Sequence, residues 1–492
     1  MLAGELMKDR IPLLRPSPRD REELGFLPAR MAELGYTEQG VRDCIGVVDV
    51  CLINWSEIPG YHWRCREEGS ARADMVTLWL LGQGVPTERL EQHLGKAELA
   101  LLKRRGLVQE REGKGFAQVD LYPCQGAWVF TDRVLSPVRL PKHVYELGKD
   151  SYVLSRVTPR DRVQSALDLC TGSGVHAVNA AAHSDRVVAV DINRRAVDFA
   201  RVNLAMNGKV GEVLQGDLYQ PVAGEAFDLI TFNPPFHPTP DEKMAKYRSG
   251  GESGEELVEP MVRGLATHLR PGGLLSMVVV YPIKADQTYA ERIQGWLGGG
   301  DGWGVAHLNF AVLSREFFIQ TNMEVKGDWE QHVEEFDRWM NSYQRQGIQS
   351  LGVANVFIRR LPQSSPGWSA YKAIPFPNRG AVAPVGPWLK ALEAFHDPGW
   401  SPDWEGRPQL DPGIRELWVN RAGLGRAEFT DPDWPTPVDL DAEETELATR
   451  LGPSLAELAT DWAERHGAGE GAGRIAVGCI LRRLGLKGLL AT

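Results

Sequence analysis

Short apolar runs that alternate with longer amphipathic stretches constrain the fold of the middle of this chain more than any other feature. The runs begin at about residue 164, and stretches such as residues 194–208 and 255–269 separate them. Strands that alternate with helices favour a parallel sheet covered on both faces. We therefore predict an α/β domain over residues 146–362. Its expected strands are residues 165–170, 186–191, 211–217, 227–232, 273–281, 305–314 and 352–360.

The residues before this domain predict a separate α+β domain over residues 1–145. Apolar residues recur at helical spacing over residues 22–55 and again over 74–105, where Gly95 divides two short helices. Two alternating stretches, 107–113 and 116–124, follow and are joined by a Gly-Lys-Gly turn, a pattern typical of a β-hairpin. Helices followed by a hairpin are the order of a winged-helix module. Its basic segment consists of Lys103, Arg104 and Arg105.

Residues 363–492 predict a C-terminal extension. To about residue 440 the extension is rich in proline, glycine and tryptophan without periodicity, which indicates irregular chain. Three short helices are expected after it, and Ser454 and Glu457 have the spacing of a capping box. Within the α/β domain, residues 328–346 predict a helix that packs on the sheet. Its apolar residues at helical spacing are Trp329, Val333, Phe336, Trp339, Met340 and Tyr343.

Composition narrows the class of protein. A net charge of −10 over 492 residues argues against a generally basic surface but allows a local basic patch. The sequence has no run of about 20 apolar residues and no apolar signal segment, so we expect no membrane partner. Six scattered cysteines without a C-x-x-C pair indicate a reducing compartment, the cytoplasm. The group Cys44, Cys51, His62 and Cys65 matches no common zinc spacing, so we expect no metal site.

Polar side chains follow four of the expected strands. Asp168, Asp191, Asp217 and Asn233 each stand at or just after a strand end. Because the carboxyl ends of parallel strands meet at one edge, where ligands bind in open α/β sheets, these residues are expected to share one site. Glycines after Asp168 would let a ligand approach the backbone, and Asp191 is placed to accept hydrogen bonds from ribose hydroxyls. Cys170 replaces the first glycine of a dinucleotide fingerprint, which disfavours nicotinamide binding.

The run "TFNPPFHPTP", residues 231–240, is unusual because a strand enters two prolines directly. With the other strand ends, it makes residues 164–281 resemble class I S-adenosylmethionine-dependent methyltransferases of the amino-methylating N-P-P-F/Y type. The resemblance implies a Rossmann-like, seven-stranded sheet and S-adenosyl-L-methionine as cofactor. The cofactor-binding residues that it implies are Asp168, Cys170, Thr171, Gly172, Gly174, Asp191, Ile192, Asp217, Leu218 and Asn233.

The same resemblance implies that Asn233, Pro234, Pro235 and Phe236 are catalytic. The Asn233 Oδ1 atom and the Pro234 carbonyl can each accept one N–H of an amino group and so aim its nitrogen at the methyl donor. The prolines stiffen the loop, and Phe236 offers a face on which a flat acceptor can stack. His237 either contacts substrate or caps the loop. We expect His176 and His183 on a helix surface.

Two subfamilies fit different parts of the sequence. "NPPFH" with residues 257–279 looks like the ribosomal-RNA guanine-N2 methyltransferases, whereas "YRSGGESGEEL", residues 247–257, looks like the release-factor glutamine methyltransferases. The winged-helix pattern and its basic segment favour a nucleic-acid base, RNA before DNA. Protein glutamine N5 is the alternative, followed by adenine N6 or cytosine N4 of DNA. A non-catalytic cofactor-binding adaptor and a DNA-binding regulator are further hypotheses, and intact Asn233 and Phe236 argue against the adaptor.

Overall fold

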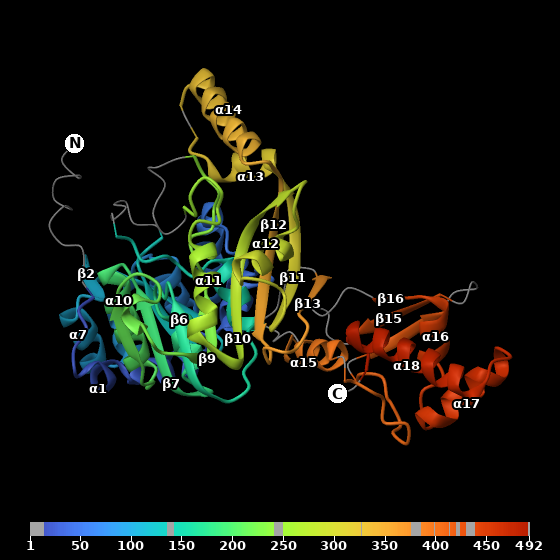
Figure 1. Cartoon of the computed structure of the whole chain (residues 1–492). Helices are drawn as coiled ribbons and strands as arrows, with labels where there is room; N and C mark the ends of the chain where they lie inside the picture. The colour runs from blue at the N-terminus through green and yellow to red at the C-terminus, as the bar shows by residue number, and fades with distance from the viewer. Residues whose placement is uncertain are drawn as a thin grey trace. The chain divides into compact units, whose positions relative to one another are not determined.

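The structure is a computed structural model (Figure 1). It describes residues 14–134, 142–240, 249–325, 327–374, 385–397, 399–412, 414–419, 424–429 and 438–490. The chain divides into two units: residues 1–156 with 162–279, and residues 157–161 with 280–492.

The first unit contains the predicted parallel sheet, in the strand order β10-β9-β6-β7-β8. All of these pairings are parallel, and β10 continues into the second unit. The chain leaves β6 in one direction through β7 and β8 and returns on its other side through β9, so the strand order reverses at β6. Ligand sites of open α/β sheets lie at such a reversal. The bounds are β6 Val163–Leu169, β7 Ser184–Asp191, β8 Glu212–Gln215, β9 Phe227–Phe232 and β10 Leu269–Lys284.

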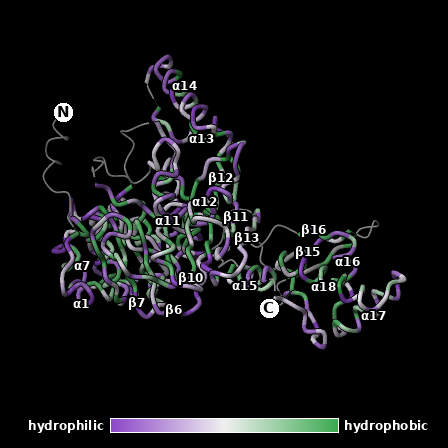
Figure 2. Tube along the Cα trace, viewed as in Figure 1, coloured by the Kyte–Doolittle hydropathy of each residue, from purple (hydrophilic) through white to green (hydrophobic). Residues whose placement is uncertain are grey.

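Helices connect these strands and bury their apolar faces. Helix α10 begins after Asn193, whose side chain accepts a hydrogen bond from the Arg195 amide, and it packs on β7 and β8 (Figure 1). Figure 2 shows hydrophobic residues gathered around β6, β7 and β10. The predicted alternation of strands and helices is confirmed here. The helices are α8 Lys149–Val157, α9 Val175–Ala180, α10 Arg194–Met206 and α11 Val258–His268, with a 3-10 turn at Gln220–Val222.

The N-terminal part of the first unit has the predicted order of helices and a hairpin. Strand β3 pairs antiparallel with both β1 and β2, and Gly95 separates α6 from α7 as expected. The expected strand over residues 116–124 is wrong: the run is broken at Gln118 and Val119, and β4 begins a second hairpin with β5. The elements are α1 Asp20–Leu24, α2 Phe26–Glu33, α3 Glu38–Ile45, α4 Ile58–Glu68, α5 Ala71–Met75, β1 Val85–Pro86, α6 Thr87–Leu94, α7 Lys96–Arg104, β2 Val108–Arg111, β3 Lys114–Ala117, β4 Asp120–Cys124 and β5 Ala127–Thr131. Short 3-10 turns span Val50–Leu52 and Trp55–Glu57, and a π turn spans Val76–Leu80.

In the second unit β11 pairs antiparallel with β12 and parallel with β13. Strand β13 falls in the stretch after residue 362, where irregular chain was expected, and α15 and β14 also lie there; that expectation is wrong for these elements. Helix α14 carries alternating hydrophilic and hydrophobic residues (Figure 2) and buries Trp339 and Tyr343, but Trp329 at its start is 75% exposed. The predicted helix therefore packs through its C-terminal half only. The elements so far are α12 Tyr289–Trp296, β11 Trp303–Ser314, α13 Arg315–Asn322, α14 Trp329–Arg345, β12 Ile348–Arg360, β13 Trp368–Ala373 and α15 Val385–His396.

The last part of the second unit holds a small sheet and the three predicted helices. The sheet has the order β14-β15-β16, and the helices pack around a separate apolar cluster that includes Leu458, Val477 and Leu484. The capping box of Ser454 and Glu457 is confirmed. The bounds are β14 Ile414–Val419, β15 Gly425–Phe429, β16 Val438–Leu440, α16 Ala442–Ala448, α17 Leu455–Arg465 and α18 Glu470–Leu486.

Among the described residues, no helix is long and apolar enough to cross a membrane.

Candidate active site

The carboxylate of Asp168 organises the turn after β6. It is 1% exposed, and its Oδ2 atom accepts hydrogen bonds from Thr171 Oγ1 at 2.5 Å and from the Ala177 amide at 3.2 Å. Its Oδ1 atom accepts from Thr231 Oγ1 on β9 at 2.7 Å. One side chain therefore holds together the ends of β6 and β9 and the start of α9.

Burial raises the pKa of Asp168 to about 6, although the hydrogen bonds from Thr171 and Thr231 act in the opposite direction. The negative charge of Asp191 raises the pKa of Asp168 further, by a smaller amount. A carboxylate with this pKa changes its charge close to neutral pH, which is uncommon for aspartate.

The turn itself leaves room for a ligand. Gly172 has φ +54°, and a side chain built there would meet no atom within 4 Å, so the backbone faces open space. Gly174 has φ +84°, and a side chain there would strike Ala200 of α10 at 2.8 Å. Cys170 adopts φ +52°, a left-handed conformation that usually requires glycine, which explains why the fingerprint has glycine at that position. The turn is held further by Asn203, whose Nδ2 atom donates to the Ser173 carbonyl at 2.7 Å.

Asp191 lies at the end of β7 and is joined to the same turn. Its Oδ2 atom accepts from the Gly172 amide at 2.9 Å, and its Oδ1 atom accepts from the Asn193 amide at 2.8 Å. Burial raises the pKa of Asp191, and these two amide bonds lower it. The next residue, Ile192, is 69% exposed and so offers an apolar side chain beside the carboxylate.

Asp217 and Leu218 follow β8 at the neighbouring strand end. The Gly216 amide donates to the Asp191 carbonyl at 3.0 Å, which places this turn beside the end of β7. The Asp217 side chain is exposed, and Leu218 has φ +43°. Three of the predicted strand-end carboxylates thus lie along one edge of the sheet.

Asn233, directly after β9, is held by two residues of α8. Its Nδ2 atom donates to Asp150 Oδ2 at 2.9 Å and to Ser151 Oγ at 3.3 Å. An amide whose nitrogen faces a carboxylate has its Oδ1 atom free to accept from another group. Burial raises the pKa of Asp150, and the Asn233 hydrogen bond lowers it. Sequence reasoning missed Asp150 and Ser151, since their only sequence signal is a polar pair at the start of a helix.

The rest of the Asn-Pro-Pro-Phe loop is covered by the glycine-rich segment 249–254. Phe236 is 8% exposed, and its ring centroid lies 5.3 Å from that of His237. The Gly250 amide donates to the His237 carbonyl at 3.0 Å, and the Thr239 amide donates to the Gly251 carbonyl at 2.9 Å. A side chain at Gly250 would lie 2.9 Å from the Phe236 backbone, so this close packing requires glycine. Tyr247 and Arg248, at the start of the segment quoted for the glutamine subfamily, lie outside the described residues.

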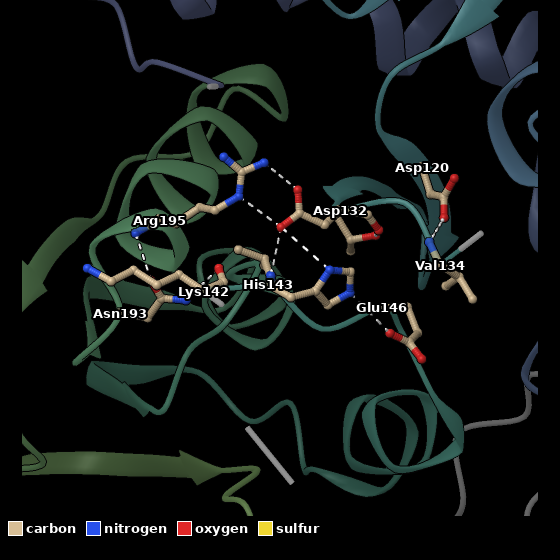
Figure 3. Close-up of polar contacts among 10 residues, drawn as sticks. Asp120, Asp132, Val134, Lys142, His143, Glu146, Asn193 and Arg195 are labelled. Carbon is tan, nitrogen blue, oxygen red and sulfur yellow. Dashed lines mark hydrogen bonds and ion pairs between the residues drawn. The ribbon is translucent and has the colours of Figure 1, made fainter. Parts of the chain in front are cut away.

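A buried ion pair fixes the segment that leads into α8 (Figure 3). Arg195 Nε donates to Asp132 Oδ2 at 2.8 Å, and the Val144 amide donates to the same oxygen at 2.8 Å. His143 lies between Asp132 and Glu146, at 3.9 Å and 3.7 Å from their carboxylates. The Lys142 carbonyl accepts from Asn193 Nδ2 at 3.1 Å. Residues 142–151 therefore run from the Asp191 end of the site, at Asn193, to the Asn233 end, at Asp150.

The expectation for His176 is wrong. Its side chain is 5% exposed, its Nδ1 atom is 3.3 Å from Ser155 Oγ, and burial lowers its pKa to about 3. His176 is a core residue of α9 because the helix turns that side toward α8.

The N-terminal part of the sequence contains a group of possible metal ligands, Cys44, Cys51, His62 and Cys65. Cys44 and Cys65 bring their sulfur atoms to 3.5 Å, while the six cysteines are all free. Among the described residues no group of three or more His, Cys, Asp or Glu side chains is arranged to hold a metal ion.

Comparisons with known proteins match the part of the chain that carries this site. The profile of the methyltransferase small domain matches residues 145–297. A Methanocaldococcus jannaschii protein, provisionally named a protein N5-glutamine methyltransferase, is 31% identical over 147 residues, which are 29% of this chain and 74% of that protein. Ribosomal RNA small subunit methyltransferase C of Escherichia coli O1:K1 is 34% identical over 143 residues, 28% of this chain. The chain spans only 38% of the length of that relative.

Among solved structures, a T. thermophilus 16S rRNA guanine-N2 methyltransferase in complex with AdoMet and guanosine aligns with 55% of this chain and 63% of its own. The TM-score of that alignment is 0.30 and the sequence identity is 17%.

Proposed function

The chain belongs to the methyltransferase small domain family of S-adenosylmethionine-dependent methyltransferases. From this membership we propose that it methylates the exocyclic amino group of a nucleic-acid base, and that the base belongs to RNA rather than to DNA. The observation that carries the proposal is the Asn233 amide, whose nitrogen is occupied by Asp150 and Ser151. Its oxygen is thereby available to an amino group. The winged-helix order of the N-terminal part supports a nucleic-acid acceptor.

The residues at the sheet edge fit the cofactor. Open space beside Gly172 and the left-handed turn at Cys170 suit close approach of a ligand to the backbone. Asp191 would hold the ribose hydroxyls, Asp217 would accept from the adenine amino group, and Asp168 would supply negative charge near the methionine end. Ile192 and Leu218 would contact the adenine ring, which is flat and apolar on its faces. When bound, the cofactor supplies an electrophilic methyl group on a positively charged sulfur.

The acceptor nitrogen is then prepared by the Asn-Pro-Pro-Phe loop. An amino group on a base ring is planar because its lone pair is delocalised into the ring. Asn233 Oδ1 and the Pro234 carbonyl accept its two N–H groups, which turns the lone pair toward the methyl donor and stabilises the developing positive charge. Pro235 limits backbone movement, so both acceptors stay in position. The proton leaves after methyl transfer, and no strong base is required. Phe236 and His237 would border the flat acceptor.

We expect that Asp150→Ala lowers kcat about 10- to 150-fold, because the loss of one hydrogen bond to a charged group costs about 1.5–3 kcal/mol and lets the Asn233 amide rotate. The KM for the cofactor should stay within about twofold, since Asp150 acts through Asn233 rather than on the cofactor. Asp150→Asn retains an acceptor oxygen and should recover part of the rate. Steady-state kinetics with methyl-labelled cofactor measure both constants.

Ser151→Ala is the matched control for this prediction. Its hydroxyl is the longer of the two contacts, at 3.3 Å, so its removal should change kcat by less than removal of Asp150. If Asp150→Ala had the same kcat as the wild type, Asp150 would not position Asn233.

Cofactor affinity should depend on pH through Asp168. Because its pKa is raised to about 6, Asp168 gains a proton as the pH falls through that value and loses the negative charge that attracts a cationic cofactor. Linkage then predicts that the affinity for the cofactor is about tenfold weaker at pH 5 than at pH 7.5 and that it is constant above about pH 7. Isothermal titration calorimetry across this range measures the effect. The affinity of Asp168→Asn for the cofactor should not change with pH over this range. If the affinity of the wild type did not rise as the pH increases through about 6, Asp168 would not be the group that controls cofactor binding.

Methylation of a protein glutamine is the second candidate, and two observations favour it. The segment 249–254 packs directly on the Asn-Pro-Pro-Phe loop, and it is the segment that resembles the glutamine subfamily. The M. jannaschii relative carries that activity in its provisional name. A glutamine side chain presents the same planar amide nitrogen to Asn233, so the chemistry at the loop would not change. The other hypotheses, a silent adaptor and a DNA-binding regulator, require no Asn233 contact.

A labelling assay separates the candidates. Purified protein, methyl-labelled cofactor and an extract of a strain that lacks the gene are incubated, and the product is divided between nuclease and protease. Label lost to nuclease supports the proposed function. Label lost only to protease moves the glutamine candidate to first place, and no label, with the cofactor bound, favours the adaptor. The six free cysteines suit the cytoplasm, where either acceptor would be found.

A further inference from the structure

The predicted basic segment of the winged-helix part is largely neutralised within the protein. Lys103 forms an ion pair with Glu110 of β2. Arg105 Nη2 lies 2.5 Å from Asp20 Oδ1, and its Nη1 lies 2.6 Å from Glu23 Oε2. Two of the three cations therefore hold α7 and the residue after it to β2 and α1, and among the described residues only Arg104 of the segment stays exposed without an ion pair.

A second basic surface lies on α4 and the hairpin turn. Trp63 of α4 is 55% exposed, and Arg66, one helical turn later, lies on the same side of the helix at i+3. Lys114, the first residue of β3, is also exposed. Helix α4 and strand β3 both pack on the π turn Val76–Leu80, and Lys114 lies close enough to α4 for its charge to act on His62. We refer to His62, Trp63, Arg66 and Lys114 as the Trp63 surface.

The electrostatics of the Trp63 surface agree with this placement. Burial lowers the pKa of His62, and the positive charges of Arg66 and Lys114 lower it further. Both cations therefore act on one side chain, although they are 48 residues apart in sequence. Within the described part of the chain, neither the Arg66 nor the Lys114 side chain has a hydrogen bond or ion pair, in contrast to the side chains of Lys103 and Arg105.

We propose that the Trp63 surface binds a single-stranded stretch of the nucleic-acid substrate, with a base stacked on Trp63 and phosphates on Arg66 and Lys114; this inference rests on the proposed function. An exposed indole beside unpaired cations is the combination that single-strand binding uses, because every base has a face that stacks and every linkage has a phosphate. Glu67, also exposed on α4 and at i+4 from Trp63, adds one negative charge next to the surface.

Nearby residues keep the surface in place. The Arg64 guanidinium lies against Gly46, where a side chain would approach it to 2.5 Å, so α4 is fixed on the end of α3. Tyr61 and Cys65 of α4 are buried, which anchors the opposite face of the helix. The Trp63 surface is thus presented on a packed helix rather than on a free loop.

Fluorescence anisotropy with a labelled oligouridylate tests the proposal on the full-length protein. Trp63→Ala should weaken binding about 5- to 150-fold, the range for loss of one stacked base. Arg66→Ala with Lys114→Ala should reduce the slope of log affinity against log salt by about 1.4, because two phosphate contacts on a single strand are lost. A duplex of the same length should bind less tightly than the single strand, since its bases are not free to stack.

The matched control is Arg30→Ala with Lys96→Ala, which removes two exposed cations from the same unit but outside the Trp63 surface. It should leave affinity and salt slope unchanged. Cofactor affinity, measured on every variant, verifies that the first unit is folded. If the variants of the Trp63 surface and the control variant had the same affinity for the oligouridylate and the same salt dependence of that affinity, the proposal would be overturned.

The labelling assay distinguishes this outcome from failure of the proposed function. If nuclease-sensitive label is formed equally by wild type and by the Trp63-surface variants, the function stands and the proposed surface is wrong. If the oligouridylate binds through Trp63 while all label is lost to protease, the surface stands and the proposed acceptor is wrong.

Discussion

Replacement of Asn233 by Ala is expected to lower kcat by about 10²- to 10³-fold, the loss typical when one preorganised polar group is removed from a transition state. In the proposed function the amide oxygen accepts from the substrate amino group and aims its nitrogen, while Asp150 and Ser151 of α8 hold the amide nitrogen. Cofactor affinity should stay within about threefold, because the turn after β6 and Asp191 remain intact. Single-turnover methyl transfer and calorimetry of cofactor binding measure the two effects separately.

Two further variants test whether the effect of Asn233→Ala is specific to the amide at this position. Asn179→Ala removes an amide of the same kind from α9, where it donates to Ser155 Oγ at 3.1 Å, and should retain a near-normal rate. Asn233→Asp keeps an acceptor oxygen but places a second carboxylate against Asp150, so it should also be slow. A near-normal rate for Asn233→Ala would refute the role given to this side chain.

Asp191→Ala is expected to have the opposite profile, with cofactor affinity reduced about 100-fold, as expected for loss of charged hydrogen bonds to a ribose. The variant also deprives the amides of Gly172 and Asn193 of their acceptor, so the turn beside the cofactor loses its anchor. At saturating cofactor, kcat should recover to within about tenfold of the wild type. Calorimetry and a cofactor titration of the rate measure both.

Asp185→Ala is the matched control for Asp191→Ala. It lies on the same strand, β7, but at the exposed start, where it pairs with Arg162. Its removal should leave cofactor affinity unchanged. If Asp191→Ala bound the cofactor as tightly as Asp185→Ala does, Asp191 at the end of β7 would not contact the ribose.

The parallel sheet and its polar edge could be predicted because their signals are local. Buried parallel strands are continuous apolar runs, and the residues that end them are read directly from the sequence. Asp168, Asp191 and the turn between them therefore fall where the sequence placed them. The hydrogen bond from Gly172 to Asp191 follows from the same geometry, since neighbouring parallel strands end side by side.

The remaining features depend on contacts between distant parts of the chain. Asp150 and Asn233 are 83 residues apart, and no periodicity relates them. The pairing of Arg105 with Asp20 spans 85 residues and hides a cation that the sequence shows as part of a basic segment. Strand β13 was missed because its alternation is short and lies in a proline-rich stretch, where propensity argues against a strand.

The most direct measurement of the central claim is mass spectrometry of nucleosides. RNA from a strain that lacks the gene is incubated with cofactor and either the wild-type protein or Asn233→Ala, then digested and analysed for N-methylated bases. We expect the wild type to methylate one base at an exocyclic amino group. The Asn233→Ala variant should form at least about 100-fold less of this product, the loss typical of one preorganised polar group. A parallel incubation uses a whole extract of the same strain. Protein-bound N5-methylglutamine in that extract, with no methylated base in its RNA or DNA, would contradict the proposed function.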